Sequence, residues 1–398
     1  MISTRSRFVG MPREVFVLGV IAFCVMVGFG VVLPVLPVYA ASFGVGNFEV
    51  GAVVSAFALM RLICSPFCPR LINLLGERLV LGIGIYIVAV SSGLTALAQD
   101  YPQLLILRGL GGIGSAMFTV SAMTLLLTSV PADRRGRATG IYQGGFLLGG
   151  MAGPAVGGVL ATISLTAPFV FYAGTLIVAG TVGLLLLHTS GQQLGGTEQP
   201  PVPFREVVAD KRYQAACLTN LAQGWTSMGV RSALVPVLIV EVLHGKPAWT
   251  GIAFACAAVV QTIMLGPAGR FSDTVGRRPA MIIGGALATA MIMIVAFAPN
   301  IWLLGLALCG YGAASAFLGT APAAAVGDAA GGRAGRPVAI FSMCSDIGAI
   351  VGPLVAGALS DRVSYPAAFA VGATLLLVGV AASARMPRTA PVLTPRST

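Results

Sequence analysis

The stretch Leu265–Arg278, LGPAGRFSDTVGRR, has a counterpart in Ser65–Arg78, SPFCPRLINLLGER. Each copy places arginines and a glycine between two long apolar runs, the pattern of a short polar turn between two helices. Further matches follow in the same order at nearly the same offset: Pro34–Leu36 with Pro236–Leu238, Gly136-Arg137 with Gly335-Arg336, and Gly149–Gly158 with Gly348–Gly357. The chain is therefore predicted to contain two similar halves.

Hydrophobic residues make up 57% of the 398 residues and charged residues only 9%, where soluble proteins carry about 25% charged residues. So little polar surface cannot cover so much apolar side chain in water. Disorder is also excluded, because disordered segments have low hydrophobicity. The composition predicts a protein that crosses a membrane several times.

A helix needs about 20 mostly apolar residues to cross a bilayer. The sequence offers twelve such stretches, apolar on all sides, whereas a barrel strand alternates over about ten residues. We therefore predict an all-α integral membrane protein of twelve transmembrane helices, arranged as two pseudo-symmetric six-helix bundles. The stretches are 15–41, 50–73, 79–98, 102–128, 137–161, 167–187, 214–242, 249–269, 279–298, 301–326, 337–360 and 364–384.

The longest polar segment, 189–212, combines glycine and proline with a charged run, which is typical of a linker. We expect an N-terminal six-helix bundle over 1–188, a cytoplasmic linker over 189–212 and a C-terminal six-helix bundle over 213–398. Six spans per half keep both halves in the same membrane orientation, so the repeat is parallel.

The net charge of +11 depends on where the basic residues lie. With the N-terminus in the cytoplasm, the predicted outer loops hold only Lys246 and Arg362, and most other basic residues fall in cytoplasmic segments. The positive-inside rule then places both termini in the cytoplasm of a cell (cytoplasmic or inner) membrane. The basic residues form small clusters between spans without base-stacking aromatics, so we expect no nucleic-acid partner.

The sequence does not contain the reactive residues in the arrangement that an enzyme active site would need. The two histidines, His188 and His244, fall near opposite membrane faces, and the glycine run Gly109–Gly114 lies inside a predicted span, where a nucleotide loop does not occur. All seven cysteines lie in spans as small buried hydrophobes. We expect no cofactor, no metal and no disulfide, and transport that is driven by a gradient.

The second loop copy fits the pattern G-x-x-x-D-x-x-G-R-R, and the chain here resembles the major facilitator superfamily. The fifth span adds G-x-x-x-G-P-x-x-G-G, which is typical of its 12-span drug:proton antiporter branch. Arg108 to Gly114 and Gly28 to Tyr39 also resemble family motifs in the fourth and first spans. The resemblance implies two halves that rock around a central site. The antiporter-type motif consists of Gly149, Gly153, Pro154, Gly157 and Gly158.

The resemblance also implies that the two loops gate the cytoplasmic side. A charge-assisted pair of Asp273 with arginine is expected to latch the halves, with Asp273 near Gly136; the alternative is that these charges only set topology. The first copy departs from the pattern, because Asn73 replaces the Asp, Pro69 the Gly and Glu77 an Arg. The gating residues are Arg70, Asn73, Gly76, Arg78, Gly269, Asp273, Gly276, Arg277 and Arg278.

The glycines of the fifth span are four residues apart and share one helix face, which lets another backbone approach closely. Pro154 removes a helix hydrogen bond and favours a bend. We interpret this helix as a hinge or a seal against proton leak; the alternative is ordinary glycine-mediated packing.

Polar residues inside the spans mark the candidate transport site, since a charge at bilayer depth costs about 2.5–3.5 kcal/mol on insertion scales. Asp346 is the only acid deep in a predicted span, so it is the candidate proton-coupling residue, with Arg108 implied as a second by the resemblance. The alternative for Asp346 is a permanent salt bridge with Arg61, Arg108 or Arg231. The candidate substrate cavity consists of Arg61, Gln143, Trp225, Arg231, Gln261 and Tyr311, although each could instead brace helices.

The leading hypothesis is a monomeric secondary transporter in the lipid bilayer that exports small hydrophobic compounds or drugs in exchange for protons. One buried acid against three buried arginines favours a second hypothesis, export of an anionic or zwitterionic metabolite or lipid-like compound. A proton symporter for nutrient uptake and a non-transporting scaffold are further alternatives.

Overall fold

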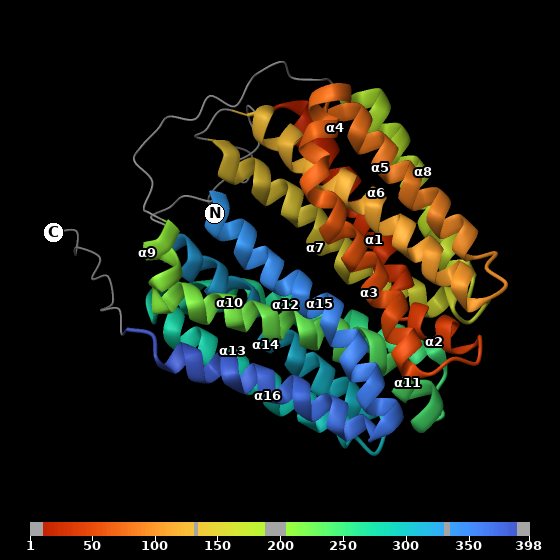
Figure 1. The fold of residues 1–398 in the computed structure, drawn as a ribbon, viewed down its shortest axis with the longest axis vertical. Helices are drawn as coiled ribbons and strands as arrows, with labels where there is room; N and C mark the ends of the chain where they lie inside the picture. The colour runs from red at the N-terminus through yellow and green to blue at the C-terminus, as the bar shows by residue number, and fades with distance from the viewer. Residues whose placement is uncertain (1–10, 131–133, 188–203, 330–334, 388–398) are drawn as a thin grey trace, which may run out of the picture. The chain divides into compact units, whose positions relative to one another are not determined.

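The computed structural model describes residues 11–130, 134–187, 204–329 and 335–387, and every regular element in these ranges is a helix (Figure 1). The predicted all-α fold is confirmed. The helices of the first half are α1 (Arg13–Val32), α2 (Leu36–Ala41), α3 (Asn47–Cys64), the 3₁₀ turn η2 (Ser65–Phe67), α4 (Cys68–Leu75), α5 (Glu77–Thr95), α6 (Tyr101–Thr128), α7 (Arg135–Leu160) and α8 (Ala167–Leu186).

The second half repeats the order of six spans after a short helix, α9, in the predicted linker. Its seventh span is unusual, because two π-helical segments interrupt it. The elements are α9 (Phe204–Ala209), α10 (Lys211–Gly224), η4 (Trp225–Leu234), α11 (Val235–Val237), η5 (Leu238–Val242), α12 (Pro247–Thr274), α13 (Arg277–Ala296), α14 (Ile301–Ala329), α15 (Gly335–Arg362) and α16 (Tyr365–Ala384). Linker residues 189–203 and both predicted cytoplasmic termini lie outside the described ranges.

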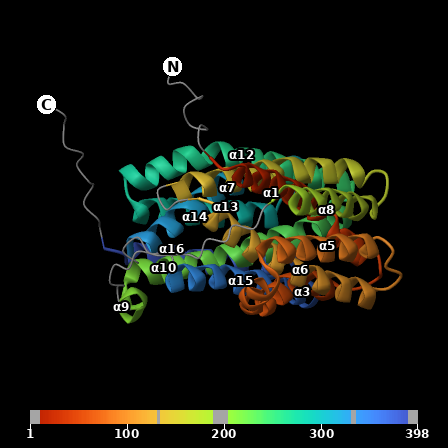
Figure 2. The ribbon, with the colours of Figure 1, turned by 90° about the horizontal axis from the view of Figure 1, so that it is seen from above.

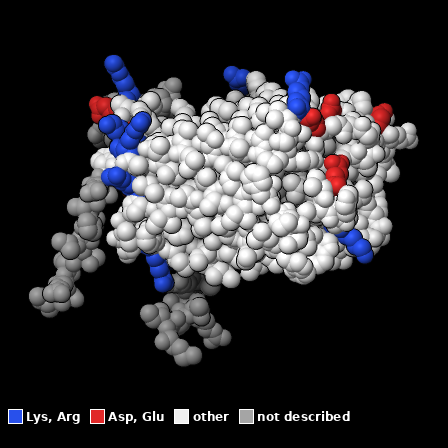
Figure 3. All heavy atoms as spheres, turned by 90° about the horizontal axis from the view of Figure 1, so that it is seen from below, with Lys and Arg blue, Asp and Glu red and all other residues white. Residues whose placement is uncertain are grey.

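Eleven helical stretches of the described chain are long and apolar enough to cross a membrane. The remaining predicted span is α7, which is 26 residues long but rich in glycine, a residue of low hydropathy. Large apolar side chains are exposed along these helices, as with Leu185 at 70% and Leu306 at 69%. The face drawn in Figure 3 carries its charged side chains near the edges and almost none in the middle. Such a surface suits contact with lipid chains.

Prolines explain why the second span of each half differs. In the first half, Pro66 and Pro69 remove backbone donors, and the span is divided into α3, η2 and α4. In the second half, Gly266 and Gly269 stand in place of Pro66 and Pro69, and α12 continues from Pro247 to Thr274 with a single interior proline, Pro267.

The chain forms two compact units. The first takes its described residues from Met1–Val35 and Ala56–Glu198, and the second from Leu36–Ser55 and Gln199–Thr398. The segment Leu36–Ser55, which we expected in the N-terminal bundle, thus packs with the second unit. In the first unit α5 lies beside α6, and in the second α10 lies beside α15 and α16 (Figure 2). The predicted boundaries at 188 and 213 stay a prediction.

Equivalent glycines make the same backbone contacts in both units. A Cβ on Gly112 of α6 would lie 2.3 Å from the carbonyl oxygen of Phe57, and one on Gly312 of α14 would lie 2.3 Å from that of Ala257. No side chain fits such a gap. Since the two contacts are related by the repeat offset, the three-dimensional structure repeats with the sequence.

The glycine face of α7 packs directly on α1 (Figure 1). Cβ atoms on Gly149, Gly153 and Gly157 would lie 2.2–2.7 Å from backbone oxygens of α1, and Pro154 and Gly158 are buried beside them. In the second unit, Gly348 and Gly352 approach the backbone of the seventh span in the same way. Both helix pairs therefore pack backbone against backbone.

Two glycines of α7 provide a matched test of this packing. A Cβ at Gly157 would lie 2.2 Å from the Val31 oxygen, whereas Gly144 has nothing within 4 Å. Gly157→Ala should lower the unfolding free energy by about 1–3 kcal/mol through overpacking. Gly144→Ala should be neutral or stabilise the helix by up to about 1 kcal/mol. Thermal unfolding of the purified variants in detergent measures both, and equal effects would contradict the packing argument.

Candidate functional site

The loop between α12 and α13 turns on a glycine. Gly276 has φ of 123°, and its counterpart Gly76 has φ of 81°. Side chains strain this left-handed region, so glycine is needed at both positions. The turn brings the end of α12 back against the start of α13, which places Asp273 beside Arg277.

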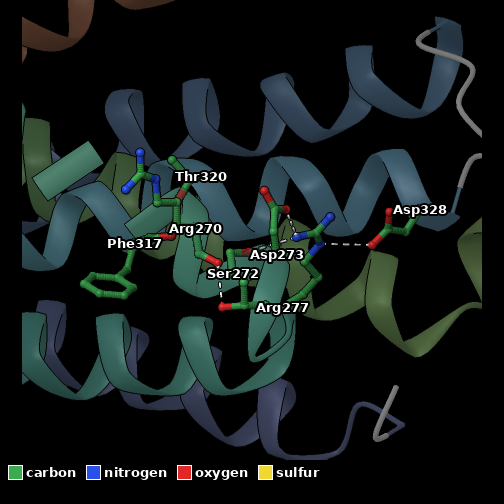
Figure 4. Close-up of polar contacts among 8 residues, drawn as sticks. Arg270, Ser272, Asp273, Arg277, Phe317, Thr320 and Asp328 are labelled. Carbon is green, nitrogen blue, oxygen red and sulfur yellow. Dashed lines mark hydrogen bonds and ion pairs between the residues drawn. The ribbon is translucent and has the colours of Figure 1, made fainter. Parts of the chain in front are cut away.

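Arg277 holds two carboxylates of the second unit (Figure 4). It pairs with Asp273 on its own loop, and its Nε donates to Asp328 Oδ2 at 3.1 Å. A further contact joins it to the Ser272 hydroxyl at 3.4 Å. Since Asp328 lies near the end of α14, this network ties the loop to the tenth span. Sequence reasoning missed Asp328, although it is an acid at a predicted cytoplasmic helix end.

The loop between α4 and α5, the first copy, makes a different contact. Arg78 donates to the backbone carbonyl of Leu184 near the end of α8. Arg70 and Asn73 are exposed, as is Arg270 in the second copy, and Arg278 is partly buried. A basic side chain thus fastens each loop within its own unit, once through carboxylates and once through a carbonyl. The predicted contact of Asp273 with the Gly136 region stays a prediction.

Arg108 is sealed inside the first unit, with 3% of its surface exposed. Its Cζ lies 4.7 Å from the centre of the Phe57 ring of α3, a cation–π distance. Its Nε is buried without a hydrogen-bond partner. The aromatic face compensates part of the buried charge.

Arg231 occupies the π-helical segment η4 of the second unit and is only partly buried. Its Cζ lies 5.4 Å from the Phe254 ring of α12 and 5.8 Å from the Tyr311 ring of α14. Its Nε is also buried without a hydrogen-bond partner. π-Helical turns occur often at functional sites, and this one directs a cation between two aromatic faces.

An amide and two hydroxyl groups complete this cluster. The Tyr311 hydroxyl donates to Gln223 Oε1 at 3.4 Å, and Gln223 Nε2 donates to the Ser315 hydroxyl at 3.2 Å. Side chains from the seventh, eighth and tenth spans therefore meet around Arg231. Of the predicted cavity residues, the structure brings Arg231 and Tyr311 together; Phe254 was missed because an isolated phenylalanine in an apolar span carries no signal.

The remaining predicted cavity residues lie elsewhere. Trp225 is buried, and its indole faces the Gly372 region of α16. Gln261 lies two turns after Phe254 on α12 and is partly exposed. In the first unit, Arg61 is partly exposed on α3 and Gln143 is exposed on α7.

Asp346 lies on α15 where this helix meets the seventh span. It is partly buried, and its neighbours touch the backbone there, with Ser345 against Gly224 and Gly348 against Leu221 and Trp225. Asp346 therefore sits beside the start of η4 in the second unit.

A second polar cluster joins the start of α3 to the end of α15, within the second unit. Asp361 Oδ1 accepts from the Asn47 amide at 2.9 Å, and Oδ2 accepts from the Phe48 amide at 2.8 Å. The Tyr365 hydroxyl accepts from Asn47 Nδ2 at 3.2 Å and lies 3.4 Å from Glu241 Oε2, to which it donates. A carboxylate at a helix N-terminus satisfies free amides and the helix dipole.

Close backbone contacts continue from this cap along α3. The Ser55 hydroxyl donates to the Ile350 carbonyl at 2.6 Å. A Cβ on Gly51 would lie 2.2 Å from the Pro353 oxygen, and one on Gly357 would lie 2.2 Å from the Asn47 oxygen. Asp361 thus ends a continuous seam between α3 and α15, which sequence analysis did not predict.

The sequence model of the Major Facilitator Superfamily matches this chain twice, over residues 18–228 and 216–397. The chain belongs to the major facilitator superfamily. It is therefore a multi-pass membrane transporter and not an enzyme, as its sequence predicts.

Curated relatives with similar sequences are drug-resistance proteins. Quinolone resistance protein NorA of Staphylococcus aureus is 32% identical over 182 residues, which are 45% of this chain and 46% of NorA. The match thus spans about half of that relative. Multidrug resistance protein MdtG of Enterobacter lignolyticus is 29% identical over 372 residues, 89% of this chain and 88% of MdtG.

Solved structures share the fold at low identity. A bacterial homologue of the human lysosomal transporter Spinster has a TM-score of 0.76 at 15% identity, covering 96% of this chain and 97% of that one. The nucleoside transporter NupG has a TM-score of 0.76 at 15% identity, covering 95% and 100%. The human organic anion transporter MFSD10 has a TM-score of 0.67 at 18% identity, covering 94% of this chain and 100% of that one.

The Asp361 cap can be tested by stability. Asp361→Asn removes the negative charge and one of the two acceptor oxygens at the start of α3. We expect the unfolding free energy to fall by about 0.5–2 kcal/mol, the usual cost of losing a helix N-cap. The neighbouring, exposed Arg362 provides the control, since Arg362→Gln also removes one charge. If thermal unfolding in detergent is the same for both variants, Asp361 is not a stabilising cap.

Proposed function

We propose that this transporter exports small hydrophobic compounds, including drugs, from a bacterial cell by alternating access, in exchange for protons. The match with MdtG over most of both chains carries this proposal. The tight packing of the Gly-Pro face of α7 on α1 supports it, because this motif is typical of exporters. The proposal places the monomer in the cell membrane with both termini in the cytoplasm.

Asp346 is the proton-coupling residue of this proposal. A carboxylate can bind and release one proton in each cycle, and Asp346 lies beside the seventh span, where the Arg231 cluster also forms. Binding of substrate near η4 would then compete with a proton at Asp346. Arg108, sealed against Phe57, is the second proposed participant.

Alternating access requires contacts that break in one part of the cycle. The seam from Ser55 to Asp361 supplies one such contact at the predicted outer side. Because its hydrogen bonds hold the start of α3 to α15, we expect them to open when the outer side opens. For the cytoplasmic side, we propose that the loop held in shape by the Arg277 network with Asp273 and Asp328 acts as the gate.

Export of anionic or zwitterionic compounds is the second candidate. Among the described residues, neither Arg108 nor Arg231 forms an ion pair with a carboxylate, so buried positive charge exceeds buried negative charge around them. An anionic substrate would balance it.

Transport into proteoliposomes under an imposed pH gradient tests the proposal. The wild type should move quinolones and other hydrophobic compounds in exchange for protons. Asp346→Asn should abolish gradient-driven transport but keep substrate exchange at equal pH, because a neutral amide cannot carry the proton. The exposed Glu206 provides the control, since Glu206→Gln should leave transport unchanged.

Two results would contradict it. Proton-linked transport that survives in Asp346→Asn would remove Asp346 from the coupling mechanism. A wild-type protein that moves no compound of a broad cationic, neutral and anionic panel would overturn the exporter assignment itself.

A further inference from the structure

We propose that Arg231 binds the carboxylate of a hydrophobic organic acid, so that the substrates of this transporter include aromatic carboxylates. This inference rests on the proposed export function and specifies one substrate class for it. The site consists of Arg231 on η4, Phe254 on α12, and Tyr311 with Gln223 and Ser315 around it.

The first argument is the missing acceptor. The described contacts of the Arg231 guanidinium are the faces of Phe254 and Tyr311, and its Nε is buried without a hydrogen-bond partner. An aromatic face attracts the cation but leaves its fork of N–H donors largely unused. A carboxylate matches that fork with two parallel hydrogen bonds.

The second argument is that other arginines of the same protein show what bracing contacts look like. Arg78 donates to the Leu184 carbonyl, and Arg277 pairs with Asp273 and Asp328. Arg231 makes neither kind of contact among the described residues. Its two aromatic contacts provide no hydrogen-bond acceptor, and a ligand that supplies one would account for the free donors.

The third argument is access. Arg108 has a similar aromatic contact but only 3% of its surface is exposed, so a ligand cannot reach it without rearrangement. Arg231 keeps part of its surface exposed while its Nε is buried. We expect a substrate carboxylate to approach the guanidinium from this exposed part, with the buried rings of Phe254 and Tyr311 behind the guanidinium.

The neighbouring polar groups fit the same ligand. Gln223 is held by the Tyr311 and Ser315 hydroxyls, so the described cluster presents a cation with neutral donors around it. Neutral groups leave the charge of Arg231 available, whereas a carboxylate in contact with it would cancel that charge.

The binding experiment uses nalidixic acid, whose only charge at neutral pH is its carboxylate, and its neutral ethyl ester. Binding to the purified full chain in detergent is measured by calorimetry. Arg231→Gln should weaken binding of the acid by about 10- to 100-fold, as for loss of a charge-assisted hydrogen bond, and leave ester binding within about twofold. Arg231→Lys should retain part of the acid binding because it keeps the charge without the planar fork.

A stability measurement separates ligand binding from bracing. Without ligand, Arg231→Gln should melt at the same temperature as wild type or higher, because it removes the desolvation cost of a partly buried charge that has no carboxylate partner among the described residues. The control Arg385→Gln removes an exposed arginine at the end of α16 and should change neither binding nor melting.

Several results would overturn the assignment. A lower melting temperature of unliganded Arg231→Gln would identify Arg231 as a bracing residue. Equal weakening for acid and ester, or no binding of the acid to wild type, would also exclude a carboxylate site. Transport of the ester by wild-type proteoliposomes distinguishes the two proposals, since ester flux without acid binding leaves the export function standing and refutes only the role of Arg231.

Discussion

The structure depends on backbone-to-backbone contact between helices. In a bilayer, every backbone N–H and C=O must be satisfied inside the chain, which restricts the spans to helices. Association of those helices cannot rely on the hydrophobic effect, because lipid is as apolar as their side chains. Close approach through glycine supplies dispersion contacts instead. Gly153 of α7 packs against α1, and Gly352 of α15 packs against the seventh span in the equivalent way.

Repetition of those contacts in both units is what places polar side chains at defined positions. The contact of Gly112 with Phe57 fixes the fourth span against the second. The contact of Gly312 with Ala257 fixes the tenth span against the eighth. Phe57 and Phe254 lie in the second span of their halves, and each contacts an arginine. The arginine is Arg108 of the fourth span in the first unit and Arg231 of the seventh span in the second. The halves therefore share a scaffold and differ in the charge that it carries.

The few charges in this chain show four ways of accommodating a guanidinium. Arg277 is neutralised by carboxylates, Arg78 donates to a carbonyl, Arg108 is sealed against a ring, and Arg231 lies partly accessible between two rings. The last arrangement combines partial exposure with aromatic contacts and a buried Nε that has no hydrogen-bond partner. This arrangement is the basis of the proposed binding of an organic acid at Arg231, whereas the loop arginines serve the connections between helices.

The sequence by itself determined the membrane class, the twelve spans, the repeat and the family. These follow from composition, from the length of apolar stretches and from short motifs, which are local properties. Glycine at 76 and 276 could be read from the loop pattern, since a tight turn demands positive φ. The partners of Arg231 and Arg277, the π-helical turn at η4 and the Asp361 cap on α3 could not. Each depends on which residues distant in the chain face one another, and Phe254, Asp328 and Asn47 carry no sign of their partners before the helices pack.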